Sequence, residues 1–257
     1  MNYFLAILAG AVQGLTEFLP VSSTGHLIIF EKIFGISQQE FGLAFDASLH
    51  LGTLLAVLLY FFRDYLKIFD FRNKLYLKLI VGTIPAAIFG LLFDSKIESS
   101  IRELWIVGIA LIVFSFVIIL SEKYGSQNKS GKKITTQKSF LIGLAQSIAL
   151  IPGISRSGAT ISAGLFLGLT REEAARFAFI LSGPIIAGAG TLKFLHIIAS
   201  HPQASDLNFF LIGIASSAIF GFLTIKYFLK YLSTKTLYPF VVYRIILGII
   251  LLLTIFR

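Results

Sequence analysis

Gln13 and Glu17 are the first side chains that could do chemistry, because they are polar groups within an apolar stretch. They lie four residues apart, so both face one side of a helix. Amide and carboxylate oxygens are ligands for a hard cation such as Mg²⁺ or Ca²⁺. A carboxylate in apolar surroundings is costly unless it has a partner, so Glu17 indicates a metal or catalytic site. Hydrogen bonds that pack helices together are the alternative, above all for Gln13.

A turn rich in hydroxyl groups follows Pro20 and contains Ser22, Ser23, Thr24 and Gly25. Its hydroxyls and backbone can donate several hydrogen bonds to an anion, and the N-terminus of a helix beginning here would strengthen that attraction. Capping of the helix by one hydroxyl is the structural alternative. His26 ends the run, and its imidazole exchanges a proton near neutral pH. It could attack phosphorus or act as a general acid or base, although an isolated histidine is often structural.

A matching turn lies further along the chain and contains Ser155, Arg156, Ser157 and Gly158, followed by Thr160. The planar guanidinium of Arg156 suits two oxygens of a phosphate, or it could pair with Glu17 or Asp46 for structure. Asp46 and His50 are also four residues apart, so they could line the same cavity or pair with each other. Two donor-rich turns with one arginine, one glutamate and one histidine predict a phosphate site rather than a cation pathway.

The composition identifies the surroundings of these groups as a membrane. Of the 257 residues 56% are apolar and 14% are charged, and the mean hydropathy is +0.86. Soluble domains have about 45–50% apolar and about 25% charged residues, so a polytopic membrane protein is expected. The absence of cysteine excludes disulfides and thiolate metal sites. The net charge of +9 is expected to reflect cytoplasmic loops, and no nucleic acid partner is expected.

Six apolar stretches reach the length of about 20 residues that a helix needs to cross a bilayer. They are 41–62, 75–93, 104–120, 174–199, 207–229 and 238–256. Two further apolar regions, 3–34 and 139–169, are each broken by a polar, glycine-containing turn. The resulting arms are short for a full crossing and are typical of a re-entrant hairpin.

The distribution of basic residues predicts the orientation. The loops at 63–78 and 121–138 hold ten of the 22 Lys and Arg residues, and 226–235 holds three more, so all three are expected in the cytoplasm. The segment 94–103 has an acidic excess and is expected outside. These assignments agree only if both broken regions return to the side they entered from. The first hairpin then enters from outside, the second from inside, and both termini lie outside.

An internal repeat is indicated by a shift of 133 residues, which relates Gln13 to Gln146, Ser22 to Ser155, Gly25 to Gly158 and Leu104 to Leu237. Chance matches between Ser- and Gly-rich segments are the alternative. Each half contains one re-entrant helical hairpin plus three transmembrane helices, and an odd number makes the halves oppositely oriented. We expect an all-α integral membrane protein with an inverted-topology repeat. It would form one domain over 1–257, with halves at about 1–123 and 138–257 and a basic cytoplasmic linker at 121–138.

Both motifs resemble a known family. The segments Gln13-Gly-Leu-Thr-Glu-Phe-Leu-Pro-Val-Ser-Ser-Thr-Gly-His26 and Pro152-Gly-Ile-Ser-Arg-Ser-Gly-Ala-Thr160 are similar to the two signatures of the undecaprenyl-diphosphate phosphatase, or bacitracin-resistance, family, and the resemblance covers the whole chain. It implies a bacterial plasma-membrane enzyme that converts undecaprenyl diphosphate into the monophosphate carrier for peptidoglycan synthesis. The family site opens outward and needs a divalent cation. Its acidic motif falls on Gln13 and Glu17, and its essential arginine on Arg156.

The expected mechanism combines these groups. Arg156 and the two turns bind the diphosphate, through Ser22, Thr24, Gly25, Ser155, Ser157, Gly158 and Thr160. Glu17 and a divalent cation, Mg²⁺ or Ca²⁺, neutralise charge as phosphate leaves, with Gln13 as a weaker metal ligand. Ser23 or His26 attacks phosphorus, or His26 activates a water. The sequence does not choose between the covalent and the direct-water route, and it leaves a homodimer open.

A transporter or flippase of an anionic lipid or small anion is the alternative function, because inverted repeats with broken helices are typical of transporters. Glu17 beside an anion path would serve no purpose in a pore, whereas a metal-assisted hydrolase would use it. A structural membrane subunit is a third hypothesis, which leaves both Glu17 and Arg156 unexplained.

Overall fold

The computed structural model describes residues 3–36, 43–70, 72, 74–100, 102–125, 134–199 and 204–255, and all regular structure within them is helical. The elements are α1 (Tyr3–Phe18), α2 (Ser23–Phe34), α3 (Leu43–Tyr60), α4 (Phe62–Leu66), the 3₁₀ turn η2 (Lys67–Phe69), α5 (Leu75–Ser100), α6 (Leu104–Tyr124), α7 (Thr136–Ile148), α8 (Arg156–Phe166), α9 (Arg171–Ala199), α10 (Ala204–Leu232) and α11 (Tyr238–Ile255). The predicted cytoplasmic residues Lys129, Lys132 and Lys133 lie outside the described residues.

Several of these helices are long and apolar enough to cross a bilayer. In the described part of the chain they are Leu75–Phe93, Leu104–Tyr124, Arg171–Thr191 and Leu207–Leu232. The pair Phe45–Tyr60 and Phe62–Phe69, which is bent by 74°, brings the number to five if it is counted as one span. This number and their apolar character indicate a multi-pass membrane protein, as predicted. The sixth predicted span, 238–256, is a shorter apolar helix over Tyr238–Thr254.

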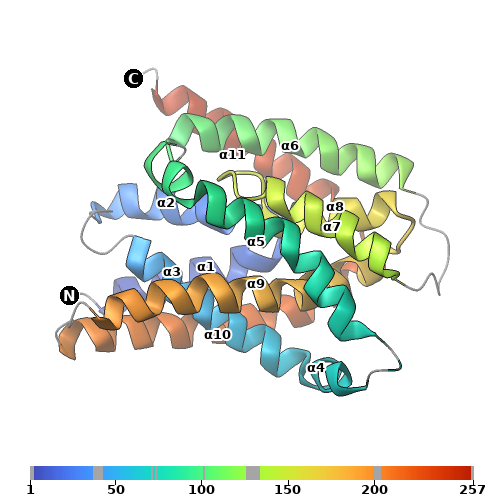
Figure 1. Cartoon of the computed structure of the whole chain (residues 1–257). Coiled ribbons are helices and arrows are strands. Elements are labelled where there is room, and N and C mark those ends of the chain that lie inside the picture. Colours follow the sequence, from blue (N-terminus) through green and yellow to red (C-terminus); the bar gives the residue numbers. More distant parts are fainter. Residues whose placement is uncertain are drawn as a thin grey trace.

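Long-range helix pairs form the bundle. Helix α1 packs along α10, α5 along α7, and α6 along α11, while α3 lies between α9 and α10. Figure 1 shows α6 and α11 together along one side of the molecule. Small residues permit this close approach: a Cβ on Gly248 would lie 2.7 Å from the carbonyl oxygen of Gly108.

Both predicted broken regions are helix–turn–helix units. The first consists of α1 and α2 and the second of α7 and α8, and in each unit the two helices contact each other. Ser22 and Ser155 precede the second helices and have positive φ angles of 72° and 80°. Each serine caps its helix, since the Oγ of Ser22 accepts from the N–H of Gly25 and that of Ser155 from Gly158. Non-glycine residues in this conformation cost about 1–3 kcal/mol, so both turns need support from their surroundings.

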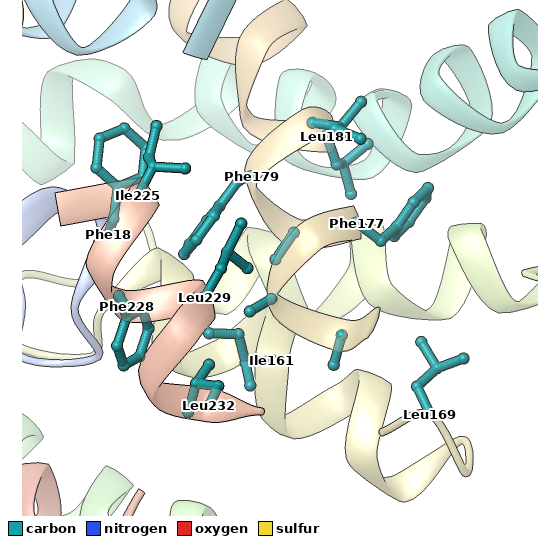
Figure 2. Packing of buried hydrophobic residues seen from close by; sticks show 14 of the residues in the cluster. Phe18, Ile161, Leu169, Phe177, Phe179, Leu181, Ile225, Phe228, Leu229 and Leu232 are labelled. Atoms are coloured by element: carbon teal, nitrogen blue, oxygen red, sulfur yellow. The ribbon is translucent and has the colours of Figure 1, made fainter. Parts of the chain in front are cut away.

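The largest buried cluster fixes the end of α1 against the second half of the chain. In Figure 2, Phe18 lies with Phe179 of α9 and with Ile225 and Phe228 of α10. The rings of Phe18 and Phe179 meet edge to face, with centroids 5.2 Å apart, which adds about 0.5–1.5 kcal/mol beyond the buried area. Since Phe18 directly follows Glu17, this core holds that carboxylate in place.

Candidate functional site

Glu17 is the centre of a buried cluster drawn from both hairpins. Its side chain is 4% exposed. The Oε2 atom accepts from Gln13 Nε2 at 2.9 Å and from Ser23 Oγ at 2.5 Å, and the Oε1 atom pairs with the guanidinium of Arg156. The structure therefore brings together four residues that were predicted as site residues, and it shows that Arg156 pairs with Glu17.

His50 completes this cluster from α3. Its Nε2 atom lies 3.7 Å from Glu17 Oε2, and its Nδ1 atom is 2.8 Å from the backbone carbonyl of Asp46. The side chain of Asp46 is bound elsewhere, by Arg102 at 2.7 Å. Asp46 and His50 were predicted to line the cavity or to pair with each other. The ring of His50 faces Glu17, and Asp46 contacts that ring through its backbone carbonyl and not through its carboxylate.

The two hydroxyl turns are interlocked. Besides capping its own helix, Ser22 Oγ accepts from the N–H of Gly153 in the other turn at 3.0 Å. In return, Ser157 Oγ donates to the carbonyl of Leu19 at 2.8 Å. The Oγ of Ser155 lies 3.1 Å from that of Ser157. These hydroxyls serve as caps and cross-links in this structure, which is the structural alternative considered for them.

The remaining predicted donors are placed differently. Thr160 is buried and donates to the carbonyl of Arg156 at 2.8 Å within its own helix. Thr24 is half-buried at the second position of α2. The backbone N–H groups of Gly25 and Gly158 are turned toward the capping serines. Among the predicted donors, Ser23 and Arg156 are the ones whose side chains contact Glu17.

His26 lies in a second environment. Its Nδ1 atom is 2.8 Å from the carbonyl of Ser22, and its Nε2 atom is 2.6 Å from the hydroxyl of Tyr243. Because a carbonyl oxygen can only accept, Nδ1 donates to Ser22. In neutral His26, Nε2 therefore accepts a hydrogen bond from the Tyr243 hydroxyl. Within the described residues no hydrogen bond or ion pair joins His26 to Glu17, so the structure does not bring these two predicted catalytic groups into contact.

Arg244 is a central residue that the sequence did not mark as part of the site. It is fully buried in α11, where it donates to the carbonyls of Pro20 and Gly153 at 3.0 Å each and to Ser115 Oγ at 3.1 Å. Pro20 belongs to the first hairpin turn and Gly153 to the second, so the guanidinium of Arg244 links the two turns. The signal that could have found it is an arginine within an apolar span.

The residues suited to a cation are few. The described part of the chain contains no group of three or more His, Cys, Asp and Glu side chains able to hold a metal ion. Gln13 is fully buried, and its Oε1 atom has no hydrogen-bond partner among the described residues. The nitrogen of the same amide bonds Glu17 Oε2, so an amide oxygen and a carboxylate oxygen belong to neighbouring side chains, and these oxygen types fit a divalent cation.

The helices and the buried carboxylate–guanidinium cluster between two hairpin turns define a multi-pass membrane protein with a polar site enclosed by apolar helices. Residues 6–250 match the model of the family described as bacitracin resistance protein BacA. The chain therefore belongs to that family.

Curated relatives named undecaprenyl-diphosphatase match over nearly their whole length. The relative from Thermodesulfovibrio yellowstonii is 45% identical over 253 residues, covering 98% of this chain and 97% of the relative. The relative from Geobacter metallireducens is 42% identical and covers 100% of both chains. The relative from Rubrobacter xylanophilus is 41% identical, with 95% and 94% covered.

Proposed function

We propose that this protein removes the terminal phosphate of undecaprenyl diphosphate, recycles the lipid carrier for peptidoglycan synthesis and thereby confers bacitracin resistance. The family and its curated relatives support this activity. The observation that carries it is the ion pair of Glu17 with Arg156, formed where the two hairpins meet. A guanidinium held by a single carboxylate can exchange that partner for phosphate oxygens, which are recognised by the same bidentate geometry.

Ser23 is the nucleophile that the geometry favours. Its hydroxyl donates to Glu17 Oε2 at 2.5 Å, so the carboxylate is placed to accept the proton as Ser23 attacks the terminal phosphorus. The bridging P–O bond breaks and undecaprenyl phosphate leaves, after which a water hydrolyses the phosphoserine and releases inorganic phosphate. His26 is less suited to attack, since Tyr243 occupies its Nε2 atom. In this scheme Arg156 orients the terminal phosphate toward Ser23 and balances the negative charge that develops on it.

A divalent cation is part of the proposal. Glu17 and Gln13 would hold it through Oε2 and Oε1, the amide oxygen that has no partner among the described residues. When bound, such an ion neutralises the diphosphate and the leaving phosphate. The chain's own contribution is to keep the Glu17 carboxylate beside Ser23 and Arg156 and to bury it with the amide of Gln13 away from bulk water.

We further propose an inverted repeat in the plasma membrane, with re-entrant hairpins and a site that opens to the outer face. The shift of 133 residues relates α1 to α7 and α10 to α5, and α1 indeed packs on α10 as α7 packs on α5. Figure 1 supports the orientation, since α1 begins and α11 ends at one end of the bundle, whereas α4 and the end of α6 lie at the other. Two of the three predicted cytoplasmic loops, 63–78 and 121–138, include most of α4 and the end of α6.

The hydrocarbon tail would lie along an apolar cavity of about 470 Å³ beside the second turn. It is lined by α6 residues, among them Trp105 and Phe114, and by Ile151 and Ile154. Ile154 directly precedes Ser155 and Arg156. A lipid diphosphate bound at Arg156 could therefore extend its tail from the polar site along an apolar wall and into the bilayer.

The test is release of inorganic phosphate from undecaprenyl diphosphate by the purified protein in detergent. We expect release that stops when a chelator is added and resumes when a divalent cation is restored. A transporter or flippase would release no phosphate under any of these conditions, and that result would refute the proposed function.

A further inference from the structure

The His50 ring has an orientation that suits metal binding, with Nε2 facing a carboxylate. Its Nδ1 atom donates to the backbone carbonyl of Asp46, so in neutral His50 the free lone pair is on Nε2, which faces Glu17 Oε2. Histidines that bind metals almost always donate their other ring N–H to a carbonyl or carboxylate, which fixes the ring and its tautomer. The ring is thus already positioned to act as a ligand.

The contact between His50 and Glu17 is not a hydrogen bond. The distance of 3.7 Å from Nε2 to Oε2 exceeds that of a protein hydrogen bond. Two ligands that are each about 2.1 Å from an ion, and that are 3.7 Å apart, subtend about 120° at the ion. An ion between these atoms would therefore satisfy both without moving either side chain far.

Gln13 supplies the third group. Its amide is completely buried, with Nε2 2.9 Å from Glu17 Oε2 and Oε1 without a partner among the described residues. A half-turn of the amide exchanges the two atoms at no cost in shape. The oxygen would then stand 2.9 Å from Oε2, which corresponds to an angle of about 90° at an ion about 2.1 Å away. This rotation directs the otherwise orphaned oxygen to the ion, and it replaces the hydrogen bond from Nε2 to Glu17 Oε2 by contacts of both oxygens with the ion.

We propose that His50 Nε2 is a direct ligand of the divalent cation, together with Glu17 Oε2 and Gln13 Oε1. This inference rests on the cation of the proposed function and changes its chemical class. Imidazole nitrogen is a preferred ligand of first-row transition ions, whereas Mg²⁺ and Ca²⁺ take oxygen ligands. The site should therefore prefer Mn²⁺ or Zn²⁺ to Ca²⁺, in contrast to the hard cation expected from Gln13 and Glu17 alone.

The competing interpretation is an ion pair between protonated His50 and Glu17. Glu17 already pairs with Arg156 through Oε1, so a second cationic side chain is not required for its charge. Asp46, the other carboxylate near His50, is bound by Arg102. If His50 is a ligand, a bound metal ion contacts its Nε2 atom, whereas in the ion pair no metal ion contacts that nitrogen.

Mn²⁺ binding to the purified apoprotein, followed by electron paramagnetic resonance, separates them. In the wild-type protein we expect bound Mn²⁺ to show magnetic coupling to one imidazole nitrogen in pulsed measurements. His50→Gln should lose this coupling and bind Mn²⁺ at least about tenfold more weakly, a loss of the size that changes around metal ligands produce. His26→Gln is the matched control and should retain both the coupling and the Mn²⁺ affinity.

Wild-type protein that binds Mn²⁺ without nitrogen coupling would overturn the proposal, and this measurement needs no variant to fold. An Mn²⁺ affinity of His50→Gln within about twofold of wild type would also overturn it, as would equal losses in His50→Gln and His26→Gln. Phosphate release is measured in parallel on the wild type. If Mn²⁺ shows the His50 coupling but no phosphate is released from undecaprenyl diphosphate, the proposed function fails while the metal site stands.

Discussion

Replacement of Arg244 by lysine tests whether the two hairpin turns must be held together for activity. Lysine keeps the charge but concentrates its donors at one nitrogen, whereas Arg244 reaches Pro20 and Gly153 from different nitrogens and Ser115 from a third. An ammonium can satisfy one of the three acceptors well. Arg244→Lys therefore loses about two hydrogen bonds to a charged donor, each contributing about 1.5–3 kcal/mol.

The expected loss of stability is about 3–6 kcal/mol, against a total of about 5–15 kcal/mol for a typical protein. For a chain of this size, at about 2–4 °C per kcal/mol, that corresponds to a fall in the thermal midpoint of about 6–24 °C. Because the turns carry Ser23 on one side and Arg156 on the other, a shift of about 1 Å between them should lower turnover about 100-fold. This loss should persist at temperatures where the variant is fully folded.

Thermal unfolding can be followed by the fluorescence of Trp105, the single tryptophan of the chain, and phosphate release measured on the same preparation. Arg176→Lys is the control, because Arg176 is 46% exposed in its ion pair with Asp64, and exposed pairs contribute little. The reasoning is refuted if Arg244→Lys unfolds within about 2 °C of wild type, or if its turnover matches that of Arg176→Lys.

Three further predictions concern the site and the orientation. Glu17→Gln should lower turnover about 10²–10³-fold, the effect of removing one charge contact in the transition state, and near-normal activity at saturating substrate and metal would make Glu17 a packing residue. Arg156→Lys should stay folded but lose most turnover, because lysine cannot bind two phosphate oxygens at once; full activity would show that charge alone suffices. A single cysteine at position 132 should resist membrane-impermeant reagents added from outside intact cells, and labelling there would refute the inverted topology.

Most helices were predictable from the sequence because apolar length and turn residues specify them locally. Pro20 and Pro152 mark both hairpin turns, and the long apolar stretches became α5, α6, α9 and α10. The span predicted over 41–62 ends in the structure at Tyr60, but the short helix α4 and the turn η2 at the start of the predicted loop 63–78 were not predicted. The structure bends by 74° after Tyr60 without proline or glycine at the break. Phe61 at this bend is 1% exposed in the core, and a local sequence pattern does not report such tertiary packing.

The same distinction applies to the site. The adjacency of Gln13, Glu17 and Ser23 follows from local spacing, and that of Arg156 from the repeat. The partners of His26 and of both turns were missed because Tyr243 and Arg244 lie more than 200 residues away from the groups they bind in the first hairpin. Nothing in a local motif specifies such contacts, which arise when α11 packs beside the hairpins.

The two turns also explain why so many polar groups occur in apolar surroundings. Ser22 and Ser155 hold strained backbone conformations, and this strain of about 1–3 kcal/mol each persists only because caps, cross-links and Arg244 over-determine both turns. Most of the hydroxyl groups in the two motifs therefore stabilise the contact between the two hairpin turns. Ser23 and Arg156 remain directed at Glu17, one as a hydroxyl donor and one as a cation. A contact between two hairpin turns that presents the proposed nucleophile Ser23, the proposed base Glu17 and the proposed phosphate-binding cation Arg156 fits catalysis better than passage of an ion.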